Sequence, residues 1–287
     1  MGLRNLFVTA LFVGMFFPPA SAAEPETPPS PREAPSRNAS VPLASHQAVY
    51  VLSLASVRSG SGILGVSGRM TYRFADTCDG WAIESHSTMD ISEDQGESLA
   101  TGWDFTAWES YDGLRYRFHV RTTQDGSVAE SIDGSARLEN EGGKGEASFV
   151  APHVAVVPLP PGTMFPTRHT RALISSAASG EKFLSHHVFD GSVLGPPFLI
   201  SAILGATLPP SAPTEMDNPL LTSRPSWRMG LAYFKTDDDG EADPTPYHEM
   251  RVRYHDNAVA ERVFQDYGPF RLEARLKELQ VLPRPDC

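Results

Sequence analysis

The stretch LRYRFHVR, residues 114–121, decides the fold class of this chain. Leu114, Tyr116, Phe118 and Val120 alternate with Arg115, Arg117, His119 and Arg121. This period of two places the apolar side chains on one face of a strand and the charged ones on the other. A strand with one face in water is typical of an antiparallel sheet, because parallel sheets bury both faces.

The same alternation recurs along much of the chain. It is found in AVYVLSL (48–54), RMTYRF (69–74), GWDFTAW (102–108), WRMGLAYF (227–234) and YHEMRVRYH (247–255). The dipeptides Asp112-Gly113, Asp125-Gly126 and Asp133-Gly134 separate such runs, and Asp-Gly is a strong signal for a short hairpin. Counting the runs predicts roughly ten to fourteen strands.

Helices are expected at only one or two places. The segment PTRHTRALISSAASG (166–180) predicts a helix, because Pro166 suits a first turn, Gly180 suits a stop and the apolar spacing lengthens to 3.6. FLISAILGATL (198–208) is expected to form a second buried helix or an inward-facing loop, and residues 272–279 fit either a strand or a helix. Many strands without alternating helices indicate a barrel or a sandwich. We therefore expect a mostly β protein whose antiparallel sheet closes or half-closes around the helix and has one apolar concave face.

The first residues predict export. Residues 1–23 have a positive charge, Arg4, before a short apolar run and small residues at the end, which is the order of a secretory signal peptide. The apolar run is too short for a membrane span, which needs about 20 residues. The next segment, 24–42, is rich in proline and predicts a disordered linker. Residues 43–287 are expected to form a single domain.

The chain has two cysteines, Cys78 and Cys287, which is its last residue. An exported chain folds in an oxidising compartment, where two thiols tend to form a disulfide. Two free thiols, one buried and one at the terminus, are the alternative. A zinc site is disfavoured, because two distant cysteines lack the clustered ligands that zinc needs.

Charge and motifs exclude several classes of function. Lys and Arg number 24 against 35 Asp and Glu, so the formal charge is -11 and a nucleic-acid partner is disfavoured. The G-x-S-x-G motif of acyl-transfer enzymes is absent, since GVSG (65–68) is one residue short. His248-Glu249 does not continue into the H-E-x-x-H motif of zinc proteases. The sequence predicts no catalytic residue.

Metal sites are also disfavoured. His186 and His187 are neighbours on a predicted strand, so their side chains point to opposite faces and do not readily chelate one ion. The acidic run TDDDGEAD (236–243) would place Lys235 and Pro246 where a calcium-binding loop needs oxygen ligands. We interpret this run as a solvated hairpin tip and predict no metal and no cofactor.

With these motifs in order, the chain resembles the family of the bacterial cell-envelope integrity protein EipB, once described as a domain of unknown function. The resemblance rests on LASHQAVYVLSL (43–54), GRMTYRFADTCDGW (68–81), FPTRHTRALISSAASGE (165–181), VFDGS (188–192), WRMGLAYF (227–234) and AVAERVFQDYGPFRLEARLKELQVLPRPDC (258–287). It covers the whole predicted domain, 43–287. Each motif alone is modest, and the set is specific.

The resemblance implies a periplasmic protein with a large spiral, incompletely closed antiparallel β-barrel and a helix on the sheet. The disulfide of the family maps onto Cys78 and Cys287. The implied function is non-enzymatic support of envelope integrity through protein binding, with a periplasmic tetratricopeptide-repeat protein as partner. The alternative is a periplasmic carrier of an apolar ligand, a lipid or lipoprotein acyl chain, in the concave face of the barrel. An envelope hydrolase is a third hypothesis, which requires a cluster of titratable groups in a cleft.

Overall fold

The structure is a computed structural model that describes residues 41–94, 96, 98–237 and 240–287. The predicted signal peptide, 1–23, and residues 24–40 of the predicted linker lie outside the described residues. No helix in the described part of the chain is long and apolar enough to cross a membrane.

The described residues form fourteen strands and one helix, joined by turns and loops. They are β1 (His46–Val57), β2 (Ile63–Asp76), β3 (Gly80–Glu93), β4 (Ser98–Ser110), β5 (Arg115–Gln124), β6 (Ser127–Leu138), β7 (Gly145–Ala151), β8 (Ala155–Leu159), α1 (Pro166–Ala178), β9 (Phe183–Val188), β10 (Phe198–Leu208), β11 (Ser226–Phe234), β12 (His248–His255), β13 (Ala260–Asp266) and β14 (Phe270–Val281).

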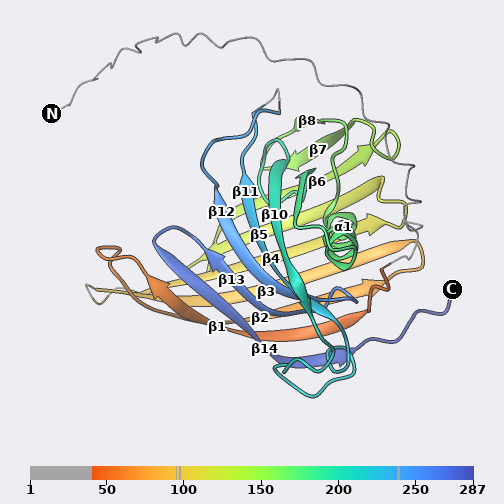
Figure 1. Cartoon of the computed structure of the whole chain (residues 1–287). Coiled ribbons are helices and arrows are strands. Elements are labelled where there is room, and N and C mark those ends of the chain that lie inside the picture. Colours follow the sequence, from red (N-terminus) through yellow and green to blue (C-terminus); the bar gives the residue numbers. More distant parts are fainter. Residues whose placement is uncertain (1–40, 95, 97, 238–239) are drawn as a thin grey trace, which may run out of the picture. The chain divides into compact units, whose positions relative to one another are not determined.

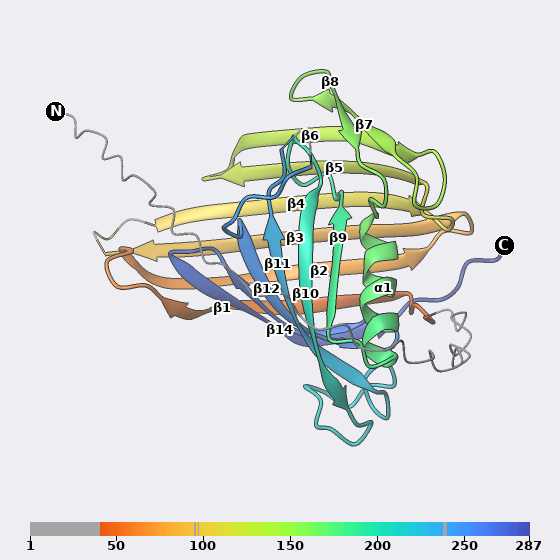
Figure 2. The ribbon, with the colours of Figure 1, turned by 45° about the horizontal axis from the view of Figure 1, so that its top comes forward.

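All the strands belong to one antiparallel sheet in the order β8-β7-β6-β5-β4-β3-β2-β1-β14-β13-β12-β11-β10-β9. The first strand pairs with the last, so two meanders join along β1 and β14. Figures 1 and 2 show β9–β12 crossing over the layer formed by β1–β8, with α1 against β9 and β10. Strands β8 and β9 are the two edges, so the sheet coils without closing. The predicted fold class is confirmed.

The alternation that predicted the sheet decides which side chains form its core. Tyr116, Phe118 and Val120 in β5 are 1%, 3% and 1% exposed, whereas Arg117 and Arg121 between and beside them lie in water. The Asp125-Gly126 prediction is also correct, because both residues have positive φ, 49° and 78°, as a two-residue type I′ hairpin turn requires.

The interior is filled from both halves of the sheet. One apolar cluster joins β2–β8, a second joins α1 to β9–β12, and a third joins β1, β2 and β14. Leu173, Ile174 and Ala177 of α1 are buried against the inner face of β10 and β11. The helix therefore occupies the concave side of this half of the sheet.

A buried carboxylate on the sheet holds the start of α1. Phe165 at the N-cap provides no side-chain cap, and Pro166 has no N–H to donate. Glu109 of β4 accepts hydrogen bonds from the backbone N–H groups of Thr167, at 2.7 Å, and Arg168, at 2.9 Å. The first turn of the helix is thus capped from a strand 58 positions earlier in the chain.

The structure joins Cys78, in the turn between β2 and β3, to Cys287 in a disulfide. The bond spans 209 positions of the sequence. The bond attaches the segment that follows β14 to the turn between β2 and β3. In the sheet, β1 lies between β2 and β14.

Two local predictions are wrong. FLISAILGATL (198–208) is neither a helix nor a loop but strand β10. Of the two alternatives left open for residues 272–279, the strand is correct, because these residues lie within β14. Asp133-Gly134 does not turn the chain, because both residues lie inside β6, at a register shift against β7. A side chain at Gly134 would collide with the ring of Phe118 and the Ser148 carbonyl, so close packing explains this glycine.

Candidate functional site

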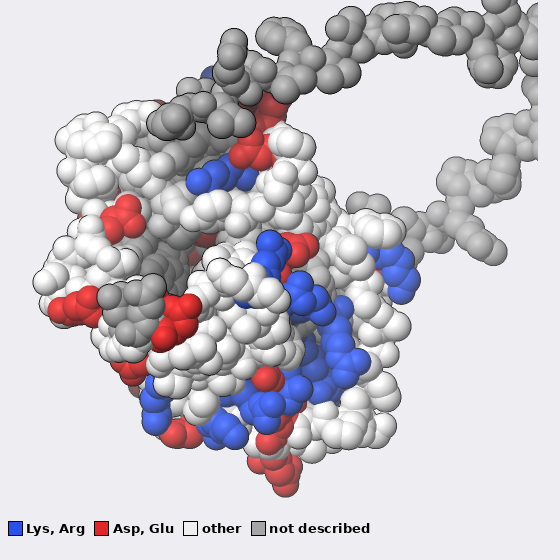
Figure 3. Space-filling model, turned by 90° about the vertical axis from the view of Figure 1, so that its left-hand side faces the viewer, with Lys and Arg blue, Asp and Glu red and all other residues white. Residues whose placement is uncertain are grey.

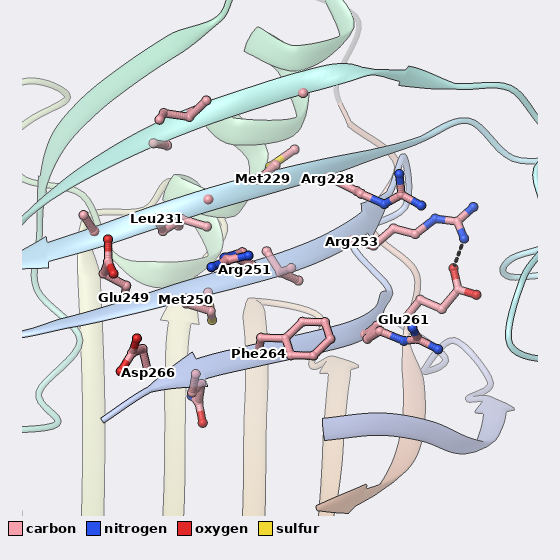
Figure 4. A pocket seen from close by; sticks show the side chains of 18 of the residues that line it. Arg228, Met229, Leu231, Glu249, Met250, Arg251, Arg253, Glu261, Phe264 and Asp266 are labelled. Atoms are coloured by element: carbon pink, nitrogen blue, oxygen red, sulfur yellow. Dashed lines mark ion pairs between the residues drawn. The ribbon is translucent and has the colours of Figure 1, made fainter. Parts of the chain in front are cut away.

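A groove of about 1460 Å³ lies on the outer face of β9–β13 (Figure 4). Strand alternation places it there. Ile200, Ala202 and Leu204 of β10 face α1, whereas Ser201 and Ile203 between them line the groove. The groove therefore lies on the face of the sheet turned away from the helix, outside the apolar interior.

Four arginines cross the groove and its border in a single row. Register pairs Arg228 of β11 with Arg253 of β12, Arg253 with Arg262 of β13, and Arg262 with Arg275 of β14. We call these four residues the arginine row. Like charges directly opposite one another destabilise a sheet, so the row opposes folding unless other groups compensate it.

Carboxylates compensate three members of the row. Arg253 forms an ion pair with Glu261 at 2.8 Å, and Arg275 forms one with Glu273 at 3.2 Å. Arg262 pairs with Glu215 and, at 3.3 Å, with Glu273. These pairs fix three guanidinium groups in place and neutralise much of their charge.

The position of Glu261 depends on an irregularity of the sheet. The register shifts between Arg253 and Tyr254, and Glu261 is the extra residue on β13. Its carboxylate also accepts hydrogen bonds from the buried His255 and from the backbone N–H of Glu215. Burial favours the neutral acid, but these hydrogen bonds and the charge of Arg253 lower the pKa of Glu261 below its usual value.

Two arginines of the groove lack such partners. The side chains of Arg228 and Arg251 form no ion pair or hydrogen bond with any residue in the described part of the chain. Both are exposed. On the face of the molecule that Figure 3 shows, Lys and Arg side chains gather along one side.

Apolar surface adjoins these charges. Ile203 pairs with Gly230, and Gly230 with Arg251, so the three positions lie in line across β10–β12. A side chain added at Gly230 would meet nothing within 4 Å, so the space above this glycine is open. Ile203 is 63% exposed and Phe183 of β9 is 75% exposed, although both are large and apolar.

The opposite end of the groove is acidic. Figure 4 shows Arg228, Arg253 and Glu261 at one end, and Glu249 and Asp266 at the other. The hydrogen bond from Arg271 to Asp266, at 2.7 Å, lowers the pKa of that carboxyl. A carboxylate held ionised in this way is a poor general acid.

A second, smaller hollow of about 480 Å³ lies on the outer face of β4–β7. Its arginines are held by neighbours. The guanidinium of Arg117 lies 4.6 Å from the centre of the Trp108 ring, and Arg137 pairs with Glu146 at 2.9 Å. The groove on β9–β13 combines greater volume with unpartnered charge and is the better candidate site.

The histidine pair and the acidic run, which the sequence disfavours as metal sites, lie outside the groove. His186 and His187 are half-buried in β9, and no group of three or more His, Cys, Asp or Glu among the described residues is arranged to hold a metal ion. Residues 238 and 239 of the acidic run lie outside the described residues. Sequence reasoning missed the arginine row, because its members are spread over four strands and only the register brings them together.

Comparison with known proteins gives consistent matches over nearly the whole chain. A family model described as EipB-like matches residues 37–283. A curated relative, the cell envelope integrity protein EipB of Brucella abortus (strain 2308), is 28% identical over 252 residues, which cover 86% of this chain and 88% of the relative. A solved structure, described as a beta-barrel-like protein of domain of unknown function DUF1849 from Brucella abortus, is similar with a TM-score of 0.75 and 26% identity. That match covers 84% of this chain and 99% of the solved one.

Proposed function

Since this chain belongs to the EipB-like family, we propose that it is a non-enzymatic periplasmic protein that supports the integrity of the cell envelope by binding a protein partner. The observation that carries the proposal is the family match over 37–283, together with a relative named for cell envelope integrity. The names of the family and of this relative describe no reaction. Residues 1–23 support export, because they follow the order of a secretory signal peptide.

Two features of the fold support partner binding. The groove on β9–β13 is open and carries exposed apolar and basic side chains, a combination typical of interaction sites. The disulfide suits a protein that works in an oxidising compartment. By family resemblance, the partner is a periplasmic tetratricopeptide-repeat protein.

A deletion strain tests the envelope role. Loss of the gene should increase sensitivity to detergents and to drugs that act on the cell wall, and expression of the full chain should restore resistance. A matched variant that lacks residues 2–23 should stay in the cytosol and fail to restore resistance. Unchanged sensitivity of the deletion strain would refute the envelope role, and full rescue by the leaderless variant would refute the periplasmic location.

The second candidate function is a periplasmic carrier of a lipid or lipoprotein acyl chain in the concave face. The apolar inner face of the sheet favours it, but α1 packs there through Leu173 and Ile174. An acyl chain bound at β10 and β11 on that face would have to displace the helix. Native mass spectrometry of gently purified protein and saturable uptake of a fluorescent fatty acid test this function, and absence of both would exclude it.

A further inference from the structure

We propose that the groove on β9–β13 is the docking site for an acidic, amphipathic segment of a partner protein, with two carboxylates of that segment bound by Arg228 and Arg251. This inference rests on the proposed function, because it names the surface and the partner chemistry through which the chain would bind a protein.

Charge complementarity selects an acidic partner. The chain as a whole is strongly acidic, with a formal charge of -11, yet arginines outnumber carboxylates among the residues that line the groove. Arg253, Arg262 and Arg271 are neutralised by their own acids, whereas Arg228 and Arg251 are not. Carboxylates of a partner would supply the missing counter-charges of Arg228 and Arg251.

The two unpaired arginines are spaced for a single segment. Arg228 pairs directly with Arg253, and Arg251 lies two residues before Arg253 on the same strand. They are therefore diagonal neighbours, whose Cβ atoms are typically about 7–8 Å apart. Acidic side chains one turn apart on a helix are about 5–6 Å apart at Cβ. The long, flexible arginine side chains can close this difference, so one short segment can engage both.

Size and apolar content favour a protein segment over a small anion. The volume of about 1460 Å³ exceeds that of the pockets that hold small molecules, roughly 300–1,000 Å³. Phe183 and Ile203 expose apolar surface at the groove, which a simple anion could not cover. An amphipathic segment covers it with its own apolar side chains while its acids reach the arginines.

An anionic membrane surface fits less well. Glu249 and Asp266 form the other end of the groove, and the concave shape admits a narrow segment better than a flat bilayer. Anionic lipid headgroups would meet these carboxylates at close range and be repelled. The acidic end would instead orient a peptide whose charge is concentrated at the end near Arg228.

The experiment measures binding of a fluorescein-labelled helical peptide to the purified mature chain. The peptide carries two Glu residues one turn apart with Leu and Phe on the same face, and its control replaces both Glu with Gln. The test variant is Arg228→Glu/Arg251→Glu. The matched control variant is Arg121→Glu, which reverses the charge of an exposed arginine on β5, outside the groove. Circular dichroism and thermal melting check that each variant folds.

We expect the Glu peptide to bind the wild type, and the Arg228→Glu/Arg251→Glu variant to bind it about tenfold more weakly, because two attractions become repulsions. The Gln peptide should bind the wild type similarly weakly, and Arg121→Glu should bind like wild type. Equal binding of the Glu peptide by wild type and double variant would overturn the proposal. Binding to phosphatidylglycerol vesicles, lost in the double variant, without binding of the Glu peptide would also overturn it, in favour of a membrane surface.

The same variants in cells separate this inference from the proposed function. A deletion strain without any envelope defect would refute the proposed function, whatever the peptide binds. A deletion strain with the defect, fully rescued by Arg228→Glu/Arg251→Glu, would refute the groove as the docking site and leave the envelope role standing. Rescue by Arg121→Glu but not by the double variant supports the inference.

Discussion

The cap of α1 by Glu109 predicts an unusual dependence of stability on pH. The Glu109 carboxylate is 1% exposed and accepts two backbone N–H groups from the first turn of the helix. Burial raises its pKa from 4.5 to about 7, although the bonds from Thr167 and Arg168 and the charge of Arg171 act in the opposite direction. Desolvation of the charged form is the larger effect.

The sign of the effect follows from proton binding. Between the unfolded pKa, 4.5, and the folded pKa, about 7, the folded chain holds a proton that the unfolded chain has lost. The free energy of unfolding therefore falls as pH rises through this interval. This rise in the pKa of Glu109 corresponds to a loss of about 3 kcal/mol in the free energy of unfolding. The whole loss is present above about pH 7, and none of it is present below about pH 4.5.

The perturbation is Glu109→Gln, which keeps the shape of the side chain but cannot ionise. The variant also loses one of the two backbone hydrogen bonds, because an amide NH₂ cannot accept an N–H, at a cost of about 1–3 kcal/mol. That cost does not change with pH. The free energy of unfolding of the wild type minus that of the variant should thus fall by about 3 kcal/mol between about pH 5 and about pH 8.

Urea unfolding followed by tryptophan fluorescence, repeated across this pH range, measures the difference. Glu130→Gln provides the matched control, because Glu130 is an exposed carboxylate on β6, and its difference from wild type should stay constant. A wild-type advantage over Glu109→Gln that is constant with pH, or that grows as pH rises, would refute the reasoning. Growth would mean that the N–H groups of the helix and Arg171 outweigh desolvation.

Three further predictions concern the closure of the fold and its core. Reduction of the Cys78–Cys287 bond, or Cys78→Ser, should lower the free energy of unfolding by up to about 5 kcal/mol, because the bond closes a loop of 209 positions. Identical denaturant midpoints for oxidised wild type and Cys78→Ser would contradict this. Gly191→Ala should cost about 3 kcal/mol, because its φ is 69° and the added Cβ would lie 2.4 Å from the ring of Phe118. Gly162→Ala, at φ 82° with nothing within 4 Å, should cost only about 1 kcal/mol, and equal losses in the two variants would show that the contact with Phe118 does not matter.

The sequence predicts the strands best where one face is apolar and the other is charged. In 114–121 Tyr116, Phe118 and Val120 are buried and Leu114 is half-buried, so the apolar residues of the pattern are those that face the core. Residues 272–279 fit two periods because β14 contains an extra residue: Val49 pairs with Glu278 and Tyr50 with Leu276, which leaves Lys277 unpaired. The bulge sets Leu276 and Leu279 three positions apart, a helical spacing, although the backbone is a strand.

The wrong prediction for 198–208 has its cause on the outward face of β10. The inward residues of β10, among them Ile200 and Leu204, are apolar as expected, but Ile203 on the outward face is apolar as well. The run therefore lacks the polar alternation that marks a strand with one face in water. Ile203 breaks the pattern at the place where β10 lines the groove, so the error points to the candidate site.

The candidate site itself depends on information that no local pattern carries. Arg251 and Arg253 are two residues apart in a strand whose sequence shows the same alternation as the other strands. Arg228 and Arg262 lie on the neighbouring strands. Their meeting is set by the register of β11–β13 and by the bulge that turns Glu261 toward Arg253. The arginine row opposes the pairing of the strands that carry it, and internal acids relieve only part of this cost. Folding stability therefore gives no reason for Arg228 and Arg251 to be unpaired, whereas an acidic partner does.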